Sequence, residues 1–147
     1  MLHVTYEAVD DLTPGRLVHV DEARGQIRVT LDAHAPLRDV VRKLNIEIDQ
    51  LMAAGHWFQW WKNEVICRET PGSPLRIDYL LHRLISGTTV ALENKGIIEF
   101  HIDPALGTEQ FAASINAAVG SLLAGGQWFQ LYAGEIIDNS PEPAVRI

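Results

Sequence analysis

The stretch Gly55-His56-Trp57-Phe58-Gln59 returns in this sequence as Gly126-Gln127-Trp128-Phe129-Gln130, 71 positions later. The same spacing relates identical residues on both sides of this motif: Gly25 and Gly96, Ile27 and Ile98, Asp32 and Asp103, Asn45 and Asn116, Leu51 and Leu122, Glu64 and Glu135. With a gap of one or two residues, Leu2 to Tyr6 also aligns with Leu75 to Tyr79. Self-similarity at one fixed period is typical of a repeated structural unit. We therefore predict that the chain is a tandem duplication.

The duplication predicts two repeat units joined by a short linker. The first unit covers residues 1–70, the linker residues 71–74, and the second unit residues 75–147. Two prolines and a glycine in this seam, Pro71, Gly72 and Pro74, are typical of a linker. Because half-units of this size bury too small a core to be stable alone, we expect both to pack into one globular domain.

Each unit contains one segment with apolar residues at helical spacing. In the first unit the apolar stripe consists of Leu37, Val40, Val41, Leu44, Ile48, Leu51 and Met52. In the second unit it consists of Phe111, Ala112, Ile115, Val119, Leu122 and Leu123. Pro36 suits the first turn of the first helix and Thr108 the N-cap of the second, while Gly55 and Gly126 suit left-handed C-caps.

The segments around each predicted helix are β-prone. Before the helix, residues 17–20 and 27–31 form one predicted hairpin, and residues 88–92 and 97–102 form the other. After the helix, residues 57–67 and 128–138 are predicted as long strands that bend or bulge at Lys62-Asn63 and Ala133-Gly134. Residues 78–86 fit a short helix as well as a strand, and the sequence leaves both open.

These elements predict an α+β fold built from two hairpin-helix-strand units. We expect an antiparallel sheet with both amphipathic helices on one face. A pseudo-twofold axis should relate the units, as in a homodimer fused into one chain.

Charge, hydropathy and cysteine content indicate which partners and which cellular compartment to expect. The formal net charge is -7, and the Lys and Arg residues form no cluster, so we expect no nucleic-acid partner. No stretch approaches the roughly 20 apolar residues of a membrane span, and the first residues lack a signal-peptide pattern. The single cysteine, Cys67, cannot form an internal disulfide. We therefore expect a soluble, acidic, cytoplasmic protein without a membrane partner, and the preference for Arg over Lys with abundant Ala and Gly favours a bacterial source.

The Trp-rich segment is the most unusual part of the sequence. Its residues Trp57, Phe58 and Gln59 recur in the second unit, so we interpret these three as structural. The flanking residues differ between the units: His56, Trp60, Trp61 and Lys62 become Gln127, Leu131, Tyr132 and Ala133. Because strand residues alternate between two faces, aromatic side chains point both ways here. One face is therefore either a partner surface or part of a thicker core.

Two glutamines flanked by aromatic residues need hydrogen-bond partners if they are buried. The sequence suggests Asn45 for Gln59 and Asn116 for Gln130, within each unit. The glutamines act either as such structural pairs or as polar anchors in a ligand cleft. Glu64 and Glu135 are predicted as surface carboxylates at strand ends.

Signatures of catalysis and metal binding are missing from the sequence. It contains no HExxH, CxxC, GxSxG, Walker or GxGxxG motif. His34 follows Asp32 by two positions, whereas His101 precedes Asp103 by two, and a duplicated metal site would keep one order. We therefore predict no metal site, no cofactor and no catalytic residue.

These observations favour a non-catalytic protein-interaction subunit of the bacterial cytoplasm, of the accessory, adaptor or immunity type. The predicted binding residues are His56, Trp57, Gln59, Trp60, Trp61, Lys62, Trp128 and Gln130. A protein partner is expected, and self-association stays open. The alternative is a small-molecule binding protein or a small isomerase- or cyclase-like enzyme with an aromatic cleft at the repeat junction, where His56 and Glu64 act as acid and base.

Overall fold

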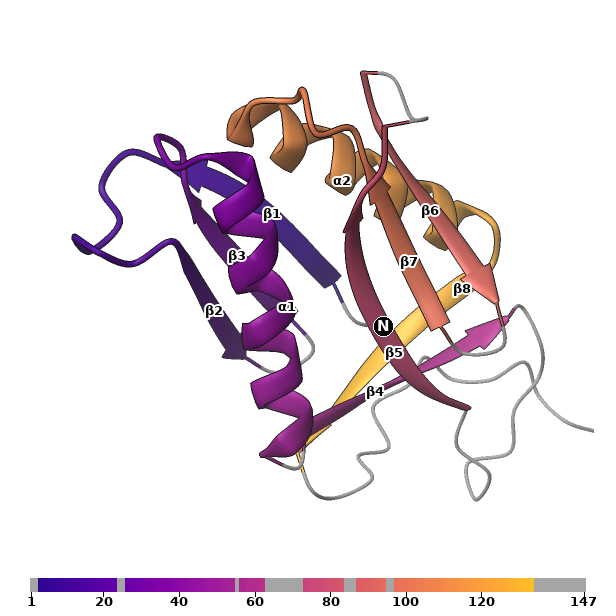
Figure 1. The fold of residues 1–147 in the computed structure, drawn as a ribbon. Coiled ribbons are helices and arrows are strands. Elements are labelled where there is room, and N and C mark those ends of the chain that lie inside the picture. The colour runs from indigo at the N-terminus through magenta and orange to yellow at the C-terminus, as the bar shows by residue number, and fades with distance from the viewer. Residues whose placement is uncertain are drawn as a thin grey trace, which may run out of the picture.

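The computed structural model describes residues 3–23, 26–54, 56–62, 73–83, 87–94 and 97–133. The described residues form an α+β fold, as predicted (Figure 1). In chain order its elements are β1 (His3–Val9), β2 (Val18–Ala23), β3 (Gln26–Asp32), α1 (Leu37–Ala53), β4 (His56–Lys62), β5 (Ser73–Leu81), β6 (Thr89–Asn94), β7 (Ile97–Ile102), α2 (Thr108–Ala124) and β8 (Gln127–Ala133).

The strands form two three-stranded mixed sheets. In the first sheet, with the order β1-β3-β2, β3 runs parallel to β1 and antiparallel to β2. In the second sheet, β7 runs parallel to β5 and antiparallel to β6. The start of β5 also pairs with β4, and β4 pairs with β8, which extends the second sheet to the order β6-β7-β5-β4-β8. The prediction of an antiparallel sheet is therefore wrong. In each sheet the second strand of the hairpin, β3 or β7, lies in the middle and pairs in parallel with the strand that precedes the hairpin, β1 or β5.

Both predicted helices are confirmed, with the predicted stripes facing the core. Leu44 and Ile115 have no exposed surface. The two helices do not share one face of one sheet, however. α1 packs against β2 and β5, and α2 packs against β1 and β6, so each helix lies where the two sheets meet. In Figure 1, α1 lies in front of the sheets and α2 behind them.

The helix ends differ from the sequence prediction by about one residue. Pro36 is the N-cap of α1, and Gly107 rather than Thr108 is the N-cap of α2. Thr108 is the first helical residue, and its hydroxyl donates to the carbonyl of Ala35 at 2.9 Å. Gly126 follows α2 in the left-handed conformation, with φ 86, as predicted for a C-cap glycine. Gly55 lies outside the described residues.

The strand predictions hold where the structure describes them. Both hairpins form, and β5 extends to Leu81, so the helix considered for residues 78–86 is wrong at least that far. β5 also takes in Ser73 and Pro74 from the predicted linker. β4 and β8 are described as far as Lys62 and Ala133, and the rest of both predicted strands falls in residues 63–72 and 134–147, which lie outside the described part. Neither of the described helices has the length and apolar character needed to cross a membrane.

One core cluster joins the inner faces of both sheets to both helices. Tyr6 of β1 and Tyr79 of β5 are both buried within it, and their hydroxyl oxygens are 2.7 Å apart. Phe100 stacks on Tyr79 with ring centroids 5.5 Å apart. The two sheets therefore share one core among the described residues.

Candidate functional site

All eight predicted binding residues belong to two strands whose backbones pair with each other. His56, Trp57, Gln59, Trp60, Trp61 and Lys62 are in β4, and Trp128 and Gln130 are in β8. The register sets Gln59 opposite Gln130 and Trp61 opposite Trp128. The side chains of these residues lie outside the described part of the structure, so their role as a binding site stays a prediction.

The backbone register relates this ladder to the rest of the second sheet. Gln59 pairs with Pro74 at the start of β5. Further along β5, Asp78 and Leu80 lie on the face of the sheet that points away from the core cluster. The backbone of β4 is thus paired with the strand that carries this outer face.

The outer face of the second sheet exposes large apolar side chains. Leu80 is 37% exposed, Leu92 50% and Ile97 40%. These are three of the four large apolar residues that stand exposed in the described part of the chain; the fourth is Ile46 of α1. Leu80 and Val90 flank His101 in one cross-strand row, and Leu92 lies beside Glu99 in the next. Exposed apolar residues that gather on one face mark interaction sites more often than scattered ones do.

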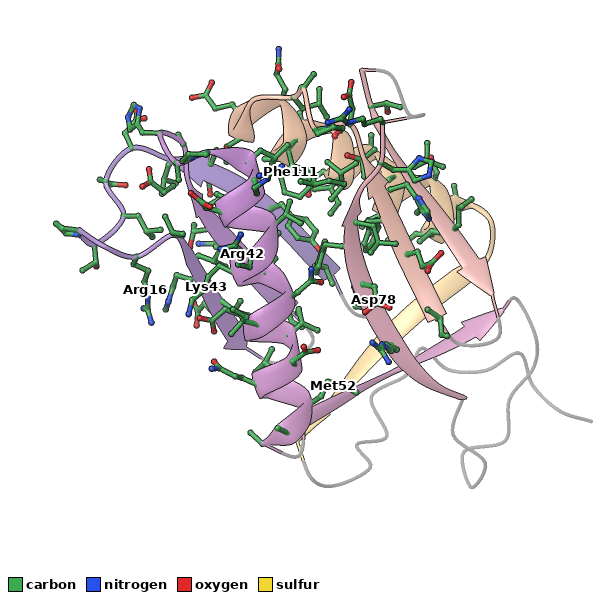
Figure 2. The ribbon with its side chains drawn as sticks, in the orientation of Figure 1. Arg16, Arg42, Lys43, Met52, Asp78 and Phe111 are labelled. Carbon is green, nitrogen blue, oxygen red and sulfur yellow. The ribbon has the colours of Figure 1, made fainter. Side chains whose placement is uncertain are left out.

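The charges on this face are paired within it. Arg76 donates to the carboxylate of Asp78 at 3.2 Å, and Nε2 of His101 lies 3.2 Å from Oε1 of Glu99 (Asp78 is labelled in Figure 2). Each acidic side chain therefore already has a basic neighbour. The face presents little net charge, although the whole chain carries -7.

A pair of imidazoles borders the same face. The ring of His82 meets that of His101 edge to face, with centroids 5.0 Å apart. The Nδ1 atom of His82 is buried and has no hydrogen-bond partner among the described residues.

The first sheet has a different outer face. Glu7, Asp21 and Arg28 are exposed there, and His19 and Thr30 stand beside them in the cross-strand rows. Counting from the two core tyrosines, Glu7 occupies the place of Leu80, because each follows its tyrosine directly. Asp21 corresponds to Leu92 in the same way. Each of these two residues pairs with a residue of the middle strand, β3 or β7, and that residue pairs in turn with the position just before the core tyrosine. One sheet thus exposes charge where the other exposes leucine.

The sequence reasoning missed this apolar face. The predicted binding residues all come from the Trp-rich segment and its counterpart, where the two units differ most obviously in composition. The sequence shows that Val90, Leu92 and Ile97 are apolar on the face opposite Thr89, Ala91 and Ile98, but it does not show which of the two faces is buried. A strand that is apolar on both faces has a second surface to cover.

The two helix asparagines serve partners other than those suggested. Asn116 accepts from the Tyr6 N–H at 2.9 Å and donates to the Tyr6 carbonyl at 2.8 Å. Asn45 makes the same two bonds to Tyr79, at 2.9 Å each. Each side-chain amide thus bonds the backbone N–H and C=O groups at the edge of a strand in the other half of the chain, as a neighbouring strand would. The side chains of Gln59 and Gln130, their suggested partners, are not among those described.

The Asp and His residues considered as metal ligands take part in turns. Asp32 accepts from the N–H of His34 at 2.9 Å, and Asp103 accepts from the N–H groups of Gly87 at 2.7 Å and Ala105 at 2.9 Å. These two hydrogen bonds hold the pKa of Asp103 below its usual value. Within the described ranges, no three His, Cys, Asp or Glu side chains come together as metal ligands. Glu64, Glu135 and Cys67 lie outside those ranges.

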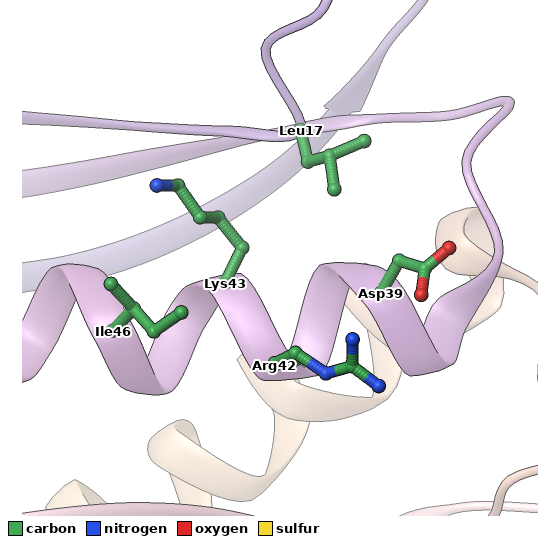
Figure 3. Close-up of a pocket in the computed structure, with 5 residues that line it drawn as sticks. All are labelled: Leu17, Asp39, Arg42, Lys43 and Ile46. Atoms are coloured by element: carbon green, nitrogen blue, oxygen red, sulfur yellow. The ribbon is translucent and has the colours of Figure 1, made fainter.

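A shallow groove of about 230 Å³ lies between α1 and the segment that enters β2 (Figure 3). It is lined by Leu17, Asp39, Arg42, Lys43 and Ile46. The groove is not at the repeat junction, where the small-molecule alternative expected a cleft. The sequence offered one sign of it, because α1 is rich in charged residues and α2 is not.

Comparison with known proteins adds no relative: no protein-family model, no curated protein and no solved structure matches this chain.

Proposed function

We propose that the chain is a duplicated, pseudo-twofold unit, in effect a homodimer fused into one domain. Three observations support this proposal. The orders β1-β3-β2 and β5-β7-β6 have the same pairing senses. Asn45 and Asn116 bind each other's half in the same way. The β4–β8 ladder is centred on Gln59 opposite Gln130, residues that are 71 positions apart, so the repeat spacing maps the ladder onto itself.

We further propose that the protein is a non-catalytic interaction subunit of the bacterial cytoplasm, with the outer face of the second sheet as its contact surface. The observation that carries this proposal is the exposure of Leu80, Leu92 and Ile97 on one face. In a duplicated chain, a face that is apolar in one half and charged in the other reflects a separate role for that half. The Trp-rich strand β4 is paired with β5, a strand that carries this surface.

The chemistry of the face indicates the kind of partner. Because Arg76 neutralises Asp78 and the carboxylate of Glu99 lies against His101, a basic partner gains little from this surface. A partner with a complementary apolar patch gains about 25 cal/mol for each Å² of apolar surface removed from water. The affinity of the complex should therefore change by less than about threefold between about 0.05 and about 0.5 M salt, since screening acts on charges and not on apolar burial.

The proposal is tested by capture of the partner with matched variants. Wild-type protein and a Leu80→Glu/Leu92→Asp variant are immobilised and exposed to an extract of the source organism. The variant places on the second sheet the residues that the first sheet carries at Glu7 and Asp21. We expect the wild type to retain one stoichiometric protein and the variant to lose it, while a Glu7→Gln/Asp21→Asn control retains it.

Two outcomes contradict the proposal. Equal retention by the wild type and the Leu80→Glu/Leu92→Asp variant would place the contact elsewhere. Absence of any stoichiometric protein, together with measurable turnover of a metabolite in the same extract, would support an enzyme instead. Circular dichroism of both variants establishes that they remain folded.

A further inference from the structure

The groove on α1 is lined by two apolar, two basic and one acidic residue. Leu17 and Ile46 are apolar, and Ile46 is 41% exposed although it belongs to an otherwise well-packed helix. The aliphatic stems of Arg42 and Lys43 add apolar surface, while their charged ends remain in water. In Figure 3, Lys43 and Leu17 stand on the same side of α1, with Asp39 and Ile46 toward opposite ends of the groove.

Two basic side chains, Arg42 and Lys43, line this groove beside one acidic side chain, Asp39. α1 as a whole balances Arg38, Arg42 and Lys43 against Asp39, Glu47 and Asp49, whereas the sequence of α2 contains no Lys or Arg. Arg16, next to Leu17, lies on the same side of the molecule as Arg42 and Lys43 (Figure 2). Lys43 lies 3.4 Å from Glu47, and among the described residues Arg42 has no ion-pair partner. The lining residues alone, two basic and one acidic, sum to a charge of +1.

The corresponding part of the second half lacks these features. The positions 71 residues later are Thr88, Gln110, Ala113, Ser114 and Ala117, which include no charge and no large apolar side chain. The groove residues are therefore not required by the fold of the unit. The two units differ at the positions that carry charge and large apolar side chains in the first unit. This is the pattern expected of a ligand site that only one unit possesses.

We propose that the groove binds a protein segment in which a large apolar side chain stands next to an aspartate or glutamate. The apolar side chain would cover Leu17 and Ile46, and the carboxylate would meet Arg42, which has no ion-pair partner among the described residues, whereas Lys43 lies against Glu47. The volume of about 230 Å³ favours one anchoring side chain over a free metabolite, since small-molecule sites usually measure roughly 300 to 1,000 Å³.

This site is separate from the apolar face of the second sheet, and it can bind whether or not that face does. The probe is a phage library of random 12-residue peptides, selected on the full wild-type chain and counter-selected on an Arg42→Ala/Lys43→Ala variant. We expect the enriched peptides to place Asp or Glu within two positions of Leu, Ile, Phe or Trp.

Calorimetry with the most enriched peptide then defines the site. We expect at least about tenfold weaker binding to the Arg42→Ala/Lys43→Ala and Ile46→Ser variants, a difference of about 1.4 kcal/mol. A similar loss should follow when Asp or Glu in the peptide becomes Asn or Gln. Arg28→Ala is the control, because Arg28 is exposed on the first sheet and does not line the groove.

Three results overturn the proposal. They are the absence of enrichment on the wild type over the variant, enrichment of peptides without acidic residues, and equal binding to the variants. If a peptide loses affinity for the Leu80→Glu/Leu92→Asp variant and not for the groove variants, the sheet face binds it and the groove does not.

Discussion

Tyr6 and Tyr79 stand 73 residues apart in the chain, and their hydroxyl oxygens lie 2.7 Å apart in the core. One hydroxyl donates to the other, so each satisfies a polar group that burial has removed from water. The rings meet edge to face with centroids 6.3 Å apart. This pair links the first strand of one sheet to the corresponding strand of the other.

Removal of one of the two hydroxyls should destabilise the protein more than removal of both. Tyr6→Phe leaves the Tyr79 hydroxyl buried without a partner and should cost about 1 to 3 kcal/mol, and Tyr79→Phe should do the same. The double variant removes both polar groups, leaves no buried hydroxyl without a partner and should cost less than either single change. Urea unfolding of the four proteins measures this coupling. Strictly additive costs would show that the hydroxyls act independently.

Alkaline pH should destabilise the protein through the same tyrosines. Burial raises the pKa of both hydroxyls above the usual value near 10, so the folded chain keeps protons that the unfolded chain releases. The stabilising contribution is complete below about pH 10 and is lost as the pH rises further, by about 1.4 kcal/mol per pH unit for each tyrosine. Unfolding free energies from about pH 9 to about pH 11 should therefore fall less steeply for Tyr6→Phe/Tyr79→Phe. Parallel curves for the two proteins would contradict this explanation.

The asparagines that satisfy the strand edges should be important for stability in both halves. Asn116→Ala and Asn45→Ala each remove two hydrogen bonds to a strand edge, so each should cost about 2 to 3 kcal/mol. Gln50→Ala, an exposed change on α1, should alter stability by no more than about 0.5 kcal/mol. Denaturant midpoints measure all three variants. Amide exchange of Tyr6 should also accelerate in Asn116→Ala and not in Asn45→Ala, because only Asn116 holds that N–H.

Which side of each helix faces the core gives a separate prediction. Leu44→Ala and Ile115→Ala should each cost about 2 to 5 kcal/mol, because both side chains are fully buried. Arg42→Ala and Glu47→Ala should change stability by no more than about 0.5 kcal/mol, since neither lies on the buried stripe. Equilibrium unfolding in guanidinium chloride compares the four proteins. Wild-type midpoints for the two core variants would mean that the helices face the other way.

Local patterns in the sequence determined the helices and hairpins. The spacing of Leu37 to Met52 predicted α1, and the β-prone runs around each turn predicted β2 with β3 and β6 with β7. These signals are local, because hydrophobic periodicity and turn residues act within a few positions. The motif that recurs at Trp57 and Trp128 likewise predicted which strands follow the helices, and the register sets these strands opposite each other.

Tertiary structure alone decided how these elements are arranged. No local pattern states that β3 lies beside β1 in parallel, or that Asn116 reaches Tyr6 across 110 residues. Such contacts depend on how two sheets and two helices close over one core, which no local spacing encodes. The same holds for the candidate surfaces. Leu80 and Leu92 look like ordinary core residues in the sequence, and only the packing of the helices against the opposite face leaves these two side chains exposed to solvent.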